Sequence, residues 1–133
     1  MSDIYTAENP YNGPWPWPHF TPGEIACRHC GELRLDPGPG SPSRSLDALE
    51  RLRALWGRPI IINSAHRCPL HNQKVGGAKN SRHLSLAFDC ACPAPLQAEF
   101  VRLARRAGFT GIGLYPRKNF VHLDLGPARR WQE

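Results

Sequence analysis

Histidine and acidic side chains near predicted strands are the residues best suited to chemistry in this chain. Six histidines are present, and three of them, His66, His71 and His83, lie in or beside a stretch rich in turn residues. A catalytic zinc needs three N, O or S ligands from the protein and an open position for water. His83, Asp89 and His122 meet that requirement, so we predict that they bind a metal ion together.

The alternation of side chains along the predicted strands indicates which of them face the metal. Successive side chains of a strand point to opposite faces. In the segment 120–125 the apolar alternate residues take the core face. The opposite face then carries Phe120, His122 and Asp124. In the segment 87–91, Asp89 shares a face with two alanines, which leave space around its carboxylate.

Five cysteines form a second group of candidate ligands. Cys27 and Cys30 have the two-residue gap of a metal knuckle, and Cys68, Cys90 and Cys92 would complete a four-ligand cluster. Three interpretations stand side by side: a structural metal, a disulfide between the N-terminal pair's segment and Cys68, or small buried thiols. Because Cys90 and Cys92 alternate with the predicted carboxylate ligand, we do not expect them to be catalytic ligands.

Two amphipathic helices and four strands are expected to position these residues. The first helix is capped by Ser43 and ends at Gly57, and the second runs from Leu96 to Gly108. The expected strands are residues 59–62, 87–92, 111–115 and 119–125. The order of elements favours an α+β fold, in which helices pack on a mainly antiparallel sheet.

The beginning of the chain is rich in proline and tryptophan. The segment 9–20 reads NPYNGPWPWPHF, which cannot join a helix or a central strand. We therefore expect an extended arm over residues 1–20 and a single domain over residues 21–133. Trp15 and Trp17 either cover an edge of that domain or dock on a partner or a neighbouring subunit.

The composition fits one ordinary globular domain. The chain has 133 residues, of which 41% are hydrophobic and 21% charged, and its net charge is +6. These proportions argue against a disordered chain, and no run is long enough to span a membrane. The basic residues are mostly scattered arginines, which suit general attraction to a polyanion rather than specific nucleic-acid binding. Residues 1–9 lack the apolar stretch of a secretory signal.

Two stretches resemble a known family. Residues 62–91, INSAHRCPLHNQKVGGAKNSRHLSLAFDCA, and residues 111–131, GIGLYPRKNFVHLDLGPARRW, are similar to zinc D-alanyl-D-alanine carboxypeptidases and peptidoglycan endopeptidases. That family shares its fold with the hedgehog signalling domain, and phage endolysins and virion proteins are common members. Residues 20–32, FTPGEIACRHCGE, also resemble the family's N-terminal segment. The resemblance thus covers most of the chain from residue 21 to residue 131.

The resemblance implies specific roles for individual residues. His83, Asp89 and His122 would be the ligands of Zn²⁺. Arg67 would hold the carbonyl oxygen or terminal carboxylate of the substrate, which suits a bidentate guanidinium. Ser81 would help to orient the site.

This sequence departs from the family pattern in three places. The family aspartate usually follows the first histidine by seven residues, whereas Asp89 follows His83 by six. His66 stands where the family usually has tyrosine, and it titrates near neutrality. Many relatives carry a general base two or three residues before the last ligand, where this chain has Phe120 and Asn119, which cannot accept a proton from water.

Asp124 is the alternative candidate for the general base. Its carboxylate either draws a proton from water at the metal or orients His122 through the second ring nitrogen. His66 is a third candidate for the base. Both roles of Asp124 are consistent with the strand pattern.

The sequence as a whole predicts a zinc metallopeptidase that cleaves the peptide stems of bacterial peptidoglycan, as a D,D-carboxypeptidase or an endopeptidase. The resemblance, together with the lack of a secretory signal in residues 1–9, implies a phage or phage-like particle, or the host cytoplasm before release, and action on the periplasmic cell wall. Other virion or tail proteins would then be the partners of the N-terminal arm. The alternative is a non-catalytic virion or tail component that binds the cell wall and keeps a metal site.

Overall fold

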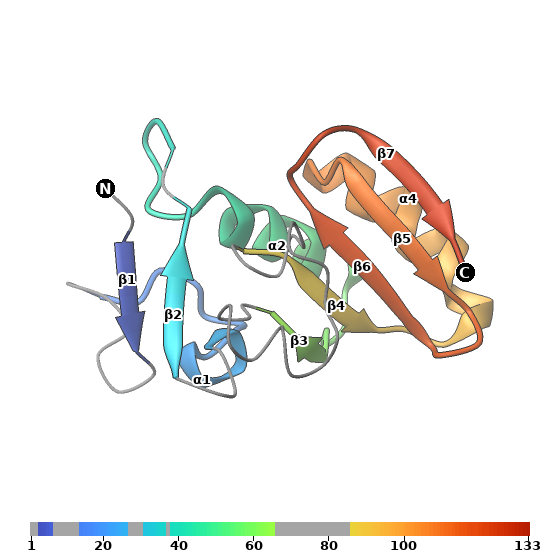
Figure 1. Cartoon of the computed structure of the whole chain (residues 1–133), viewed down its shortest axis with the longest axis horizontal. Coiled ribbons are helices and arrows are strands. Elements are labelled where there is room, and N and C mark those ends of the chain that lie inside the picture. The colour runs from blue at the N-terminus through green and yellow to red at the C-terminus, as the bar shows by residue number, and fades with distance from the viewer. Residues whose placement is uncertain (1–2, 7–13, 27–30, 37, 66–85) are drawn as a thin grey trace.

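A five-stranded sheet carries the core of this computed structural model, which describes residues 3–6, 14–26, 31–36, 38–65 and 86–133. The strand order is β3-β4-β6-β5-β7 (Figure 1). The strands are β3 (Ile62–Ser64), β4 (Phe88–Ala91), β5 (Gly111–Tyr115), β6 (Phe120–Asp124) and β7 (Arg129–Gln132). The expected strands around β4, β5 and β6 are confirmed, whereas the first one lies at residues 62–64 rather than 59–62.

The sheet is mixed, which corrects the expectation of a mainly antiparallel sheet. The pairs β3–β4, β4–β6 and β5–β6 are antiparallel, but β7 runs parallel to β5. The chain leaves β6, crosses the start of β5 and continues on its far side. Thr110 supports this crossing, because its N–H donates to the Asp124 carbonyl at 3.1 Å and its carbonyl accepts from the Arg129 N–H at 3.0 Å.

Both predicted helices are confirmed, and their ends follow the expected capping rules. Helix α2 spans Arg44–Trp56 and helix α4 spans Gln97–Ala107, preceded by the 3₁₀ turn η2 (Ala94–Leu96). The Ser43 hydroxyl accepts a hydrogen bond from the Leu46 N–H at 3.2 Å, and Gly57 takes the left-handed conformation that ends α2.

The helices cover one face of the sheet, and the candidate site residues lie on the other face. Helices α2 and α4 pack against each other behind the strands (Figure 1). Phe88 and Cys90 of β4 and Val121 and Leu123 of β6 are fully buried in the core between these layers. Asp89 and His122, the residues that alternate with them, therefore point to the opposite face.

A second sheet lies at the other end of the molecule and was not expected. Strands β1 (Asp3–Thr6) and β2 (Glu32–Leu35) pair antiparallel, next to the short helix α1 (Pro22–Ile25). Leu33 and Leu35 of β2 are buried in the core. Nearby, the Trp17 indole is 1% exposed and donates to Asp47 at 2.9 Å, so this side chain covers the domain itself.

None of the helices in the described residues is both long and apolar enough to cross a bilayer.

We expect that Ser43→Ala lowers the free energy of unfolding by about 1–2 kcal/mol. The substitution removes the cap of α2 and also the hydrogen bond at 2.5 Å that the Ser43 hydroxyl donates to Asp36. Urea denaturation measures the change, with the exposed Gln132→Ala as control. Equal stability of the two variants would contradict the prediction.

Candidate active site

Strand register brings the site residues into one row across the sheet. His122 on β6 lies opposite Asp89 on β4 and opposite Gly113 on β5. Gly113 in turn lies opposite Trp131 on β7. Directly paired residues share a face, so these four residues form a row on the face that the helices leave open.

The His122 imidazole is held between two carboxylates. Its Nδ1 lies 3.1 Å from Asp89 Oδ1, and its Nε2 lies 2.6 Å from Asp124 Oδ2. The residue is only 7% exposed. Burial lowers the pKa of His122, but the hydrogen bonds to Asp124 and Asp89 outweigh this effect and raise the pKa above its ordinary value.

Asp124 is itself fixed by four hydrogen bonds. Its Oδ1 accepts from the Gly126 N–H at 2.8 Å and from Arg129 at 3.0 Å, while Oδ2 accepts from Arg129 at 2.6 Å and faces His122. Burial opposes ionisation, yet these partners hold the pKa of Asp124 well below its usual range. The result is a buried carboxylate anion with one orientation and little room for another partner.

Two glycines on β5 make space for this network. A Cβ at Gly111 would stand 2.1 Å from an Asp124 oxygen, and a Cβ at Gly113 would stand 2.3 Å from the Trp131 ring. The indole lies with its centroid 5.2 Å from the His122 ring, and its N–H donates to the Tyr115 hydroxyl at 2.8 Å. The Trp131 ring therefore sits directly over β5, beside the imidazole.

Two of the three predicted zinc ligands, Asp89 and His122, are described, and their placement fits one shared zinc ion. Because Asp124 engages Nε2, the Nδ1 atom of His122 is the nitrogen left to face Asp89. Two atoms that bind one tetrahedral zinc at about 2.0–2.1 Å lie roughly 3.3 Å from each other, and the observed separation is 3.1 Å. Within the described ranges no group of three or more His, Cys, Asp or Glu residues is arranged so that it could hold a metal ion, and His83 lies outside these ranges.

The part of the chain that holds most of these elements matches the sequence model of a known family. The Peptidase M15 family model matches residues 18–124, which is most of the chain. The chain belongs to the Peptidase M15 family. It is 36% identical over 107 residues to the peptidoglycan L,D-endopeptidase MepK of Escherichia coli K12, an alignment covering 73% of this chain and 54% of that protein. It is 33% identical over 82 residues to the zinc D-Ala-D-Ala carboxypeptidase of Streptomyces albus G, covering 59% of this chain and 32% of that protein.

Several predicted site residues of this M15 chain lie outside the described residues. They are Cys27, Cys30, His66, Arg67, Cys68, Ser81 and His83. Their assigned roles in metal binding, substrate binding and catalysis therefore stay predictions. Of the predicted residues that the structure describes, Asp89, His122 and Asp124 come together.

The two described cysteines lie on the core side of β4 and just beyond its end. Cys90 and Cys92 are free and buried. Burial raises the pKa of Cys90 well above its ordinary value, and that of Cys92 to about 11. Both thiols are therefore protonated near neutral pH, as expected for buried cysteines with a structural role.

The positions where many relatives carry a general base have structural roles in this M15 chain. Asn119 takes a left-handed conformation with φ of 56°, and its side-chain oxygen accepts from the Ala94 N–H at 3.2 Å. Phe120 stacks on Tyr115 with ring centroids 4.3 Å apart. Asn119 thus joins the β5–β6 turn to the 3₁₀ turn η2, and Phe120 packs against β5.

Arg129, Trp131 and Gly113 belong to the site and were missed by the sequence reasoning. The available signal was the Gly111-Ile112-Gly113 pattern, because glycine at alternate strand positions indicates that something approaches that face closely. The residue that approaches Gly113 lies on β7, which was not expected to be a strand.

We expect Arg129→Gln to weaken zinc binding by roughly tenfold, because loss of the guanidinium frees the carboxylate that orients His122. The matched control is Arg130→Gln, since Arg130 is the exposed neighbour on the same strand. Competition with a chromogenic chelator measures zinc affinity. Equal affinities of the two variants would show that the ion pair does not position the imidazole.

Gly113→Ala should displace the Trp131 indole and destabilise the protein by about 1–3 kcal/mol, as overpacking does. The control is Gly23→Ala, because a Cβ at Gly23 would meet no atom within 4 Å. Urea denaturation and the near-ultraviolet circular dichroism of the tryptophans report the two effects. A Gly113 variant as stable as the Gly23 variant would contradict the close approach.

Proposed function

We propose that this chain is a zinc-dependent peptidase that hydrolyses peptide bonds in the stems of bacterial peptidoglycan. The observation that carries the proposal is the pairing of His122 Nδ1 with Asp89 on the face of the sheet opposite the helices. Membership of the M15 family and the activities for which the two relatives are named support it. The chain spans about half the length of the MepK relative, so the activity remains a proposal.

In this proposal the metal ligands are His122, Asp89 and His83. A bound zinc would supply a Lewis acid that activates water and polarises the scissile carbonyl. Asp124 orients His122, since its four hydrogen bonds and 2% exposure leave it poorly placed to exchange protons with water. Arg129 keeps that carboxylate charged and in place.

The remaining roles fall to residues outside the described ranges. Arg67 would bind the carbonyl oxygen or a terminal carboxylate of the substrate through its guanidinium, and Ser81 would help to orient the site. With Asp124 assigned to orientation, His66 becomes the candidate for the general base, because an imidazole titrates near neutrality.

A second candidate function is wall binding without catalysis. It is favoured by Asn119 and Phe120, which stand where many relatives carry the base and which have structural roles here. A protein of this kind would keep the metal and pellet with peptidoglycan but would release no products.

The bond cleaved and the setting are finer parts of the same proposal. The relatives are named for an L,D-endopeptidase and a D-Ala-D-Ala carboxypeptidase, so both an internal and a terminal bond are candidates. Mass spectrometry of the released peptides separates them. Association with a phage or phage-like particle rests on the family resemblance, and immunodetection of the chain in purified particles tests it.

We expect the wild type to contain one zinc ion per chain at this site. The His122→Ala variant should lose that ion, because one of its three ligands is removed. Elemental analysis measures the metal, and chromatography of digested peptidoglycan measures cleavage, which a chelator should abolish. The control is Arg130→Gln, which should keep both metal and activity. A zinc-loaded wild type that pellets with peptidoglycan and cuts nothing would favour the binding function instead.

A further inference from the structure

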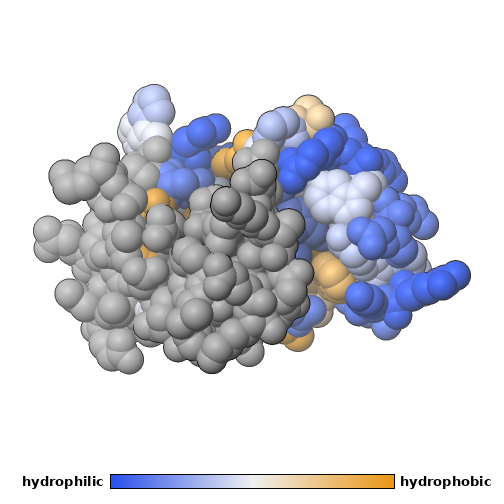
Figure 2. Space-filling view, in the orientation of Figure 1, coloured by the Kyte–Doolittle hydropathy of each residue, from blue (hydrophilic) through white to orange (hydrophobic). Residues whose placement is uncertain are grey.

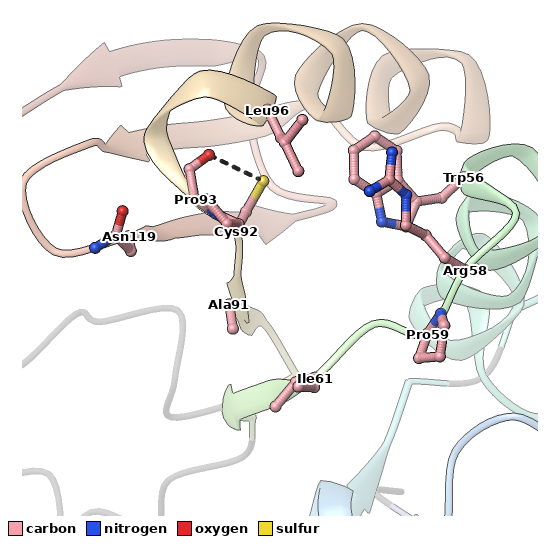
Figure 3. A pocket seen from close by; sticks show the side chains of 9 residues that line it. All are labelled: Trp56, Arg58, Pro59, Ile61, Ala91, Cys92, Pro93, Leu96 and Asn119. Atoms are coloured by element: carbon pink, nitrogen blue, oxygen red, sulfur yellow. Dashed lines mark hydrogen bonds between the residues drawn. The ribbon is translucent and has the colours of Figure 1, made fainter.

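A pocket opens beside the candidate site, where the end of β4 and the start of β3 meet the end of α2 and the start of η2. Its volume is about 410 Å³, which lies in the range of small-ligand sites. Figure 3 shows its walls: Trp56 and Arg58 on one side, Leu96 on another, and Ile61 across from them. The lining is mostly apolar and includes no acidic residue.

Arg58 supplies the positive charge of this pocket. Its guanidinium carbon lies 4.5 Å from the centroid of the Trp56 ring, a cation–π contact. The Trp56 ring is in turn held edge-to-face against Phe100 at 5.0 Å, so its position is fixed. Among the described residues no carboxylate forms an ion pair with Arg58.

The apolar wall is accessible to a ligand. Ile61 is 64% exposed, which is unusual for a large apolar side chain in this molecule. The nearby Cys92 thiol is buried and protonated, so it adds no negative charge that would neutralise Arg58. A cation without a carboxylate partner among the described residues, beside an exposed aliphatic wall, complements an anion that carries an aliphatic part.

The pocket and the candidate metal site share strand β4. Ala91, which lines the pocket, lies two residues beyond Asp89 on β4 and on the same face. Two residues of a strand span roughly 7 Å. An extended peptide lying across His122 and Asp89 therefore reaches the pocket within two or three residues.

The described surface away from the pocket has a different character. Figure 2 shows that the described residues over β5, β6 and β7 are mostly hydrophilic on the face in view. An apolar helix from a partner protein would need a long groove, and a volume of about 410 Å³ suits one or two residues.

We propose that this pocket is a substrate subsite, which binds a carboxylate-bearing residue of the peptide stem through Arg58 and lays its aliphatic part on Ile61. This inference rests on the proposed function, since it names the part of the substrate that the same site would select. Peptidoglycan stems contain both short aliphatic side chains and free carboxylates, so they supply such a residue.

The test is a binding measurement without metal, so it does not depend on turnover. The probes are a soluble disaccharide–tetrapeptide from peptidoglycan and the same compound with its carboxylates amidated, and the protein is chelator-treated full chain. By calorimetry, wild type should bind the free acid roughly tenfold more tightly than the amide, as expected for a charge-assisted hydrogen bond. Arg58→Gln should reduce that preference by several-fold, and any preference that remains belongs to Arg67.

Two further variants complete the design. Ile61→Ser replaces an exposed side chain, so the variant should fold, and it should weaken binding of both probes by several-fold. Arg106→Gln, on the exposed side of α4, is the matched control and should bind as wild type does. Thermal melting confirms that all variants are folded.

Several results would overturn the subsite. Equal binding of acid and amide by wild type would do so, as would an Arg58→Gln protein that behaves like Arg106→Gln. Ultracentrifugation showing a wild-type dimer that Ile61→Ser dissociates would make the pocket an interface between copies. Cleavage of peptidoglycan with an unchanged KM in Arg58→Gln would remove the subsite and leave the proposed function intact. Conversely, Arg58-dependent binding by a zinc-loaded protein that cuts nothing would remove the peptidase function alone.

Discussion

The site depends on one imidazole ring that is clamped by carboxylates at both nitrogens. Asp124 engages Nε2 of His122 from the interior, which leaves Nδ1 to face Asp89 on the neighbouring strand. A ring held in this way presents a single nitrogen in a single direction, which metal binding requires. The carboxylate in the interior is tolerable only because Arg129 and a backbone amide neutralise and fix it.

The sheet provides this clamp through backbone register rather than through loops. His122 and Asp124 come from β6, Asp89 from the neighbouring β4, and Arg129 and Trp131 from β7, while the glycines of β5 let the indole and the carboxylate approach the backbone closely. The pocket near Arg58 uses the same framework, because it opens at the end of the strand that carries Asp89. Asp89 of the candidate metal site and Ala91 of the candidate subsite therefore lie two residues apart on one strand.

The sequence predicted the parts of the fold that have strong local signals. Helices α2 and α4 have apolar residues at helical spacing and glycines at their ends, and the alternation around His122 indicated its face. Strand β7 was not predicted because Arg129 and Arg130 interrupt any apolar run, and because its pairing with β5 joins segments that are distant in the sequence. The contact between Arg129 and Asp124 requires β7, so it was not predicted either. For β2, the alternating apolar residues Leu33 and Leu35 were a strand signal that the prediction did not use.

The pairing of β7 with β5 must keep its register for the site to form. Side chains alternate between faces with a period of two, so a slip of β7 by one residue would turn Arg129 and Trp131 toward the opposite side of the sheet. Two contacts specify the observed register: the Thr110 carbonyl accepts from the Arg129 N–H at 3.0 Å, and Gly113 leaves the space that the Trp131 ring fills. A strand at the edge of the sheet thus decides whether the buried carboxylate meets its counterion.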